Sequence, residues 1–166
     1  MVAFYALLAA VLFGSGDFLG GRATQRTSIL SVLATSHLVG LILILVLAPL
    51  MAERFDGGDF ALGMEASGFG LLGLVLLYRG LARGPMAVVA PVTAVTCAAL
   101  PVLWGVAFGE ELSGRQVIGI ILGLVSIALV SRTPAEASVS PSPRLITESL
   151  LAGVGFAAFY IVIDGT

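Results

Sequence analysis

Intensely apolar stretches, each close to 20 residues long, follow one another along nearly the whole chain of 166 residues. A helix rises about 1.5 Å per residue, so roughly 20 apolar residues cross a hydrocarbon core about 30 Å thick. Six such stretches alternate with short polar breaks, and the sequence therefore predicts an all-α, polytopic membrane protein. The expected helices cover residues 2–21, 28–51, 61–83, 86–108, 114–131 and 147–164.

The composition excludes several classes of function. Only 11% of the residues are charged, against roughly 25% in soluble domains. With a net charge of -2 and no lysine, the chain offers no basic surface to nucleic acid. One histidine and one cysteine, Cys97, cannot supply a metal-ligand cluster, and no nucleophile stands beside a base. The sequence predicts no catalytic residue, no metal, no cofactor and no enzymatic activity.

The polar breaks indicate how the helices are joined. Residues 57–59 (Gly-Gly-Asp) should separate the second helix from the third. Gly84-Pro85 ends one helix and starts the next, which predicts a tight antiparallel hairpin. Ser113 is followed three residues later by Gln116, a capping box that should start the fifth helix.

A possible internal repeat organises the chain. Residues 132–146 are rich in proline and serine and are expected to be a flexible linker. Beyond them, Leu150–Phe156 (LLAGVGF) matches Leu7–Phe13 (LLAAVLF) at five of seven positions, although small apolar helices also resemble one another by chance. Residues 1–131 would then form one five-helix unit and residues 147–166 the first helix of a second, inverted unit. On this interpretation the chain is a fragment of a longer transporter; otherwise a homo-oligomer partner supplies the remaining helices.

The arginines do not give one clear membrane orientation. Six lie in the first, third and fifth connections or beside them, against two in the second and fourth. This excess would place the odd-numbered connections in the cytoplasm and the N-terminus outside. The six are Arg22, Arg26, Arg79, Arg83, Arg132 and Arg144, and the two are Arg54 and Arg115.

Three stretches carry a resemblance to a known family. They are FGSGDFLGG in the first helix, where Phe13 precedes Gly-Ser, LLYRGLARGPMAVVAPVTAV around the Gly84-Pro85 hairpin, and FGEELSGRQVIGIILGLVSIALV near the fifth helix. Together they resemble the EamA domain of the drug/metabolite transporter superfamily. The resemblance implies ten helices in two inverted halves, export or exchange of amino acids and other small metabolites, and no enzymatic activity. It also implies cytoplasmic termini, which conflicts with the arginine count and leaves the orientation open.

Ionisable side chains within spans are costly, so they are the first candidates for substrate or proton coupling. Asp17 could carry a coupled proton, or could be interfacial beside Arg22. His37 could titrate or bind substrate, or could hydrogen-bond a backbone carbonyl. Arg79 could hold a substrate carboxylate or extend to the lipid headgroups. Three further carboxylates are expected to be helix-terminal: Glu65, Glu148 and Asp164.

Other residues are candidates for shaping a cavity or packing helices. Tyr78 and Trp104 could line a pathway, and Pro91 and Pro101 could kink the fourth helix around it. Gly119 and Gly123, four residues apart, are the best candidates for an interface between halves or protomers.

The function expected from the sequence is transport of a small organic solute across a bacterial inner membrane by alternating access. The first, third, fourth and sixth helices would face the cavity. The partners would be the solute, the lipid bilayer and the missing second half. Two alternatives remain: a non-transporting membrane scaffold, and a multidrug exporter with Asp17 as its proton carrier.

Overall fold

The structure is a computed structural model, and it describes residues 2–51, 56–130 and 142–164. These residues form six α-helices and no β-strand. The helices are α1 (Val2–Thr24), α2 (Ile29–Met51), α3 (Gly57–Arg83), α4 (Met86–Ala107), α5 (Gly114–Val130) and α6 (Pro143–Ile163). The prediction of an all-α, polytopic fold is confirmed.

Five of the helices are long and apolar enough to cross a membrane: α1, α2, α3, α4 and α6. The shorter α5 has 17 residues, the lower end of the length that spans a bilayer. Large apolar side chains are exposed along α1, α2 and α5. In a bilayer such side chains contact lipid or further helices, so their exposure is expected of a membrane protein.

Two helices begin four residues earlier than the sequence indicated. Residues 57–59, expected to be a break, form the first turn of α3, because the Asp56 carboxylate accepts hydrogen bonds from the amides of Gly58 and Asp59. Similarly, α6 begins at Pro143 because the Ser142 hydroxyl accepts a hydrogen bond from the amide of Leu145. Both starts were missed because the capping residues lie within polar stretches that were assigned to connections.

Two other predicted connections are confirmed, whereas residues 132–141 of the expected linker lie outside the described residues. The α3–α4 hairpin has only Gly84 and Pro85 between its helices, and the Gly84 amide donates to the Gly80 carbonyl over 2.8 Å. At the start of α5 the Ser113 amide donates to Gln116 Oε1 over 2.8 Å, and the Gln116 amide donates to Ser113 Oγ over 3.4 Å. This reciprocal pair is the predicted capping box.

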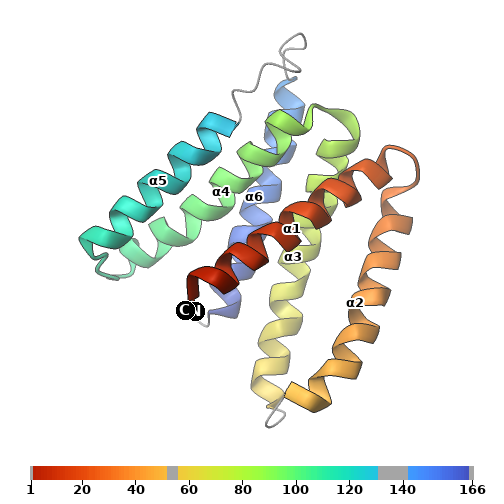
Figure 1. Cartoon of the computed structure of the whole chain (residues 1–166), viewed down its shortest axis with the longest axis horizontal. Coiled ribbons are helices and arrows are strands. Elements are labelled where there is room, and N and C mark those ends of the chain that lie inside the picture. The colour runs from red at the N-terminus through yellow and green to blue at the C-terminus, as the bar shows by residue number, and fades with distance from the viewer. Residues whose placement is uncertain (1, 52–55, 131–141, 165–166) are drawn as a thin grey trace.

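The sixth helix lies at the centre of the bundle, packed against α3 and α4, with α1 crossing nearby (Figure 1). Three glycines permit this close packing. A β-carbon at Gly155 would lie 2.8 Å from the Gly73 amide nitrogen, and one at Gly153 would lie 2.8 Å from the Thr93 carbonyl oxygen. The Thr93 hydroxyl also donates to the Ser149 carbonyl over 3.0 Å in a buried position. Thus α6 is fixed by backbone contacts with both neighbours.

The structure also sets the direction of each helix. The end of α1, the end of α3 and the start of α6 meet at one end of the bundle, where Gln25 donates to the Leu81 carbonyl and Gly84 adjoins Leu145. Hence α1 and α6 run in opposite directions across the bundle. That relation is what an inverted second copy of α1 requires. The division into two units itself stays a prediction.

Candidate functional site

A polar face of α1 is turned toward the interior of the bundle. Gly20, Gly21 and Thr24 are buried against α3 and the hairpin, and Asp17 lies one turn earlier on the same face. Residues three and four apart share one side of a helix, so the burial of Gly20 and Gly21 directs Asp17 inward. Asp17 is accordingly half-buried, whereas Phe13, one further turn away, is 69% exposed.

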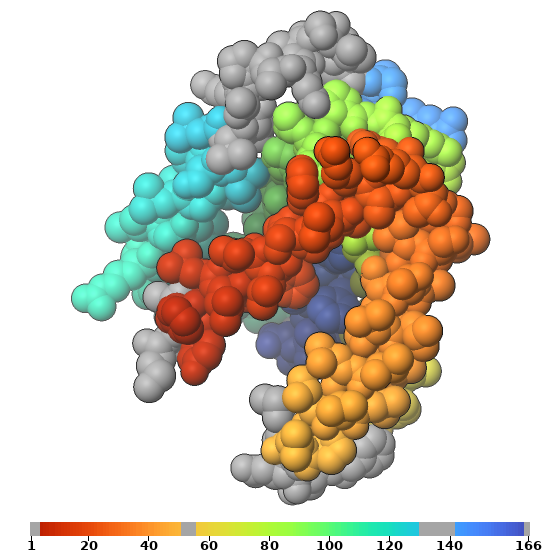
Figure 2. Space-filling model, turned by 45° about the vertical axis from the view of Figure 1, so that its right-hand side comes forward, coloured from red at the N-terminus to blue at the C-terminus, as the bar shows by residue number. Residues whose placement is uncertain are grey.

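Three polar or thiol groups from other helices are linked electrostatically to Asp17, directly or through one another. Asp17 interacts electrostatically with Tyr78 of α3 and Tyr160 of α6, and Tyr160 also interacts with Cys97 of α4. Figure 2 shows a hollow beside α1, between α1 and α2, with α6 exposed inside it. One carboxyl group and two phenols, from three different helices, therefore influence one another within the bundle.

Tyr78 is packed more tightly than a residue that lines an open pathway. Its side chain is only 6% exposed and its hydroxyl lies against the backbone of α1 at Gly20. A β-carbon at Gly20 would overlap this hydroxyl, so a larger residue there would force the Tyr78 ring to move. Tyr78 therefore joins α1 to α3 next to Asp17.

Arg79 lies beside a carboxylate from another helix. Its Nε is 3.4 Å from Glu148 Oε1 of α6, and the same oxygen lies 3.7 Å from Nη1 of Arg83 and 3.3 Å from Nε of Arg144. The geometry of the Arg79 pair does not make a hydrogen bond, and Arg79 Nε is buried without a hydrogen-bond partner. Glu148 is 12% exposed and thus links α6 to the end of α3. We call Arg79, Arg83, Arg144 and Glu148 the arginine cluster.

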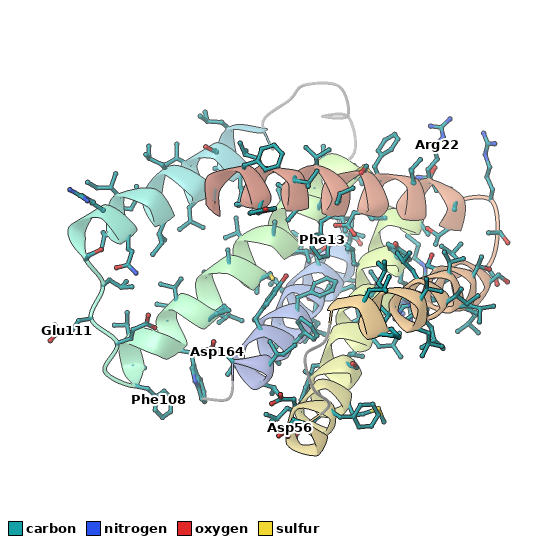
Figure 3. The ribbon with its side chains drawn as sticks, turned by 60° about the horizontal axis from the view of Figure 1, so that its bottom comes forward. Phe13, Arg22, Asp56, Phe108, Glu111 and Asp164 are labelled. Atoms are coloured by element: carbon teal, nitrogen blue, oxygen red, sulfur yellow. The ribbon has the colours of Figure 1, made fainter. Side chains whose placement is uncertain are left out.

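A second cavity, of about 1070 Å³, opens between α4, α5 and α6 at the opposite end. Pro101 and Trp104 line it, and the Trp104 and Phe108 ring centroids lie 4.5 Å apart. Tyr160 and Asp164 contribute from α6. Figure 3 shows Arg22 at one end of the bundle, and Phe108, Glu111 and Asp164 at the other.

The remaining candidates lie apart from these groups. His37 is on α2, and its Nδ1 lies 2.8 Å from the Leu33 carbonyl, so this nitrogen donates within its own helix. Pro91 is half-buried in α4, which continues as a helix through it, and Pro91 does not line the cavity. Gly119 borders the cavity, and no atom of another element lies within 4 Å of a β-carbon built at Gly119 or Gly123.

Sequence reasoning missed three residues that the structure brings into contact. Glu148 was taken for a helix-terminal carboxylate, yet it pairs with arginines far away in the sequence. Tyr160 and Thr93 were not considered. A polar residue on an otherwise apolar face was the available signal for Thr93 and Tyr160, but hydropathy does not identify which helix such a residue faces.

No group of three or more histidine, cysteine, aspartate or glutamate side chains that could hold a metal occurs among the described residues. The described residues form membrane-length helices that pack through glycines, with an inward-facing carboxyl group on α1 and an open hollow beside that helix. They define a polytopic α-helical membrane protein with a polar site in its interior.

The family follows from comparison with known proteins. The model of the EamA-like transporter family matches residues 1–132, most of the chain, and the chain belongs to this family. The resemblance noted from the sequence is thereby confirmed. No curated protein and no solved structure matches the chain. The family is one of membrane transporters, so the chain is a multi-pass membrane protein of the drug/metabolite transporter superfamily.

Proposed function

We propose that this chain forms part of a transporter that moves a small organic solute, such as an amino acid or related metabolite, by alternating access. The observation that carries the proposal is the inward-facing, half-buried Asp17 of α1, which interacts electrostatically with Tyr78 of α3 and Tyr160 of α6. A carboxyl group within a span is costly unless it serves binding or coupling. Membership of a transporter family supports the same conclusion.

The solute would bind between α1, α3, α4 and α6, and a second five-helix unit would complete the walls. The opposite directions of α1 and α6 support an inverted arrangement of the two units. We place the protein in the bacterial inner membrane, acting as an exporter. A second copy of the chain is the alternative source of the missing walls.

The test is solute flux by the full gene product in proteoliposomes, compared with its Asp17→Asn variant. Asparagine keeps the shape of the side chain and removes its charge and its proton. We expect flux to fall by about tenfold or more, equivalent to about 1.4 kcal/mol in the barrier, while helicity and elution volume stay unchanged.

The matched control is Glu111→Gln, which removes one carboxylate from the exposed connection between α4 and α5. It should change flux less than about twofold, since exposed charges are screened. Normal flux in Asp17→Asn would refute the role of Asp17. Absence of flux for every candidate solute, with normal folding, would favour the scaffold alternative.

A proton-coupled multidrug exporter is the second candidate, and the position of Asp17 favours it too. Collapsing the proton gradient should then abolish flux in the parent protein and leave the residual flux of Asp17→Asn unchanged. If a second five-helix unit supplies the remaining walls, the isolated chain of 166 residues should show no flux, whereas flux from it would favour assembly from two copies.

A further inference from the structure

The arginine cluster lies where two membrane-spanning helices reach the surface. Arg83 is the last residue of α3, and Arg144 is the second residue of α6. The apolar spans of both helices end there, so their side chains lie at the level of the lipid headgroups. The start of α6 adds the partial positive charge of a helix N-terminus.

The charges of the cluster do not balance. Three guanidinium groups share one carboxylate, and all three ion pairs found among the described residues use the same oxygen, Glu148 Oε1. The cluster therefore carries a surplus of two positive charges. No acidic side chain of the described residues besides Glu148 pairs with these arginines.

The surplus charge is accessible. The side chain of Arg83 is 54% exposed and that of Arg144 is 76% exposed, whereas Glu148 is only 12% exposed. Each guanidinium has five N–H donors, and Glu148 takes at most a few of them from each arginine. The remaining N–H donors of Arg83 and Arg144 can bind a second anion in addition to the Glu148 carboxylate.

Glu148 also limits the conformations of the arginines. A free arginine at a membrane surface samples many rotamers and loses entropy when it binds. Here Arg83 comes from α3 and Arg144 from α6, and Glu148 holds both toward one point. A site that is already ordered binds its ligand at lower entropic cost.

We propose that Arg83 and Arg144, held by Glu148, form a binding site for a phosphate group at the membrane surface. Two arginines can chelate a phosphate through paired N–H donors, and both stand at the ends of membrane-length helices, where phospholipid phosphates lie. The phosphate belongs to an anionic phospholipid or to a soluble phosphate ester, two sources with the same chemistry. The proposal does not depend on the transport function.

The experiment measures binding of phosphatidylglycerol to the chain in neutral detergent by native mass spectrometry. The test variant is Arg83→Gln/Arg144→Gln. The matched control is Arg22→Gln/Arg26→Gln, which also removes two positive charges from exposed arginines, at the same end of the bundle but outside the cluster. We expect the apparent Kd to rise about tenfold or more in the test variant and less than about threefold in the control.

A second variant guards against misfolding. Arg83→Lys/Arg144→Lys keeps both charges but loses the planar fork of donors, and should weaken binding by an intermediate factor. Helicity and elution volume of each variant are compared with those of the parent. Equal weakening in the cluster and control variants would overturn the site in favour of unspecific attraction.

A parallel titration separates the two sources. Glycerol phosphate has the phosphate but no acyl chains, and its binding is followed by thermal shift in lipid-free detergent. Phosphatidylglycerol binding without a glycerol phosphate shift assigns the site to lipid. A saturable shift that disappears in Arg83→Gln/Arg144→Gln assigns it to a soluble phosphate ester. Absence of both signals in the parent chain overturns the proposal.

Discussion

Replacing Gly155 with alanine would place a methyl group against the backbone of α3. The added β-carbon would lie 2.8 Å from the Gly73 nitrogen, 2.9 Å from the Gly73 Cα and 3.0 Å from the Phe69 carbonyl oxygen. Backbone atoms cannot rotate away as a side chain does, so the two helices must separate. The shift needed to restore ordinary contact is about half an ångström, and a gap of that size forfeits about a quarter of the dispersion energy of neighbouring contacts.

Overpacking of this kind costs about 1–3 kcal/mol, and the better helix propensity of alanine returns up to about 1 kcal/mol. We therefore expect Gly155→Ala to lower the free energy of unfolding by about 1–2 kcal/mol. The assay is reversible unfolding in mixed micelles with rising SDS, followed by circular dichroism. It reports the equilibrium between packed and separated helices.

The matched control is Gly123→Ala in α5, where nothing lies within 4 Å of the added β-carbon. Its unfolding free energy should stay the same or rise slightly. The reasoning would be refuted if Gly155→Ala were as stable as the parent chain, or if the two variants lost equal stability.

Two further predictions concern packing around the same helices. Thr93→Val removes the buried hydrogen bond to the Ser149 carbonyl and should lower the free energy of unfolding by about 1 kcal/mol. Thr96→Val loses only a hydrogen bond to Val92 in its own helix and should lower it less. Unfolding in SDS measures both values. Gly20→Ala should destabilise the contact of α1 with α3, and adding Tyr78→Phe should restore only part of the stability, because it removes the overlapping hydroxyl but keeps the ring carbon Cζ that also overlaps. A double-mutant cycle measures this coupling, and strict additivity would contradict the contact.

The membrane-spanning helices could be predicted from the sequence because bilayer thickness imposes a length on each apolar run. Local chemistry was also readable where a cap joins residues close in sequence, as with Ser113 and Gln116. The caps Asp56 and Ser142 escaped notice because hydropathy assigns polar residues near a helix start to the connection. In each case only a few residues were misplaced.

The candidate site was harder to predict, because it depends on which faces of separate helices meet. An inward position for Asp17 follows from the burial of Gly20 and Gly21, which sequence alone does not reveal. The pairing of Glu148 with Arg79 and Arg83 joins the two sides of the predicted linker, and no local pattern marks it. Glu148 can pair only with residues at helix ends on the same side of the membrane, but this condition does not identify which of them it contacts.

The close packing of α6 on α3 and α4 bears on how such a protein could have evolved. Along the chain, α6 follows the end of the family match at residue 132, yet in space it fills the groove between two helices of the matched segment. If an ancestral five-helix protein was duplicated, the first helix of each copy would have packed between helices of the other copy. Neither copy would then keep a complete core alone. Fusion into a single polypeptide would have secured equal amounts of both, and later loss of either part would leave an unfilled groove in the survivor.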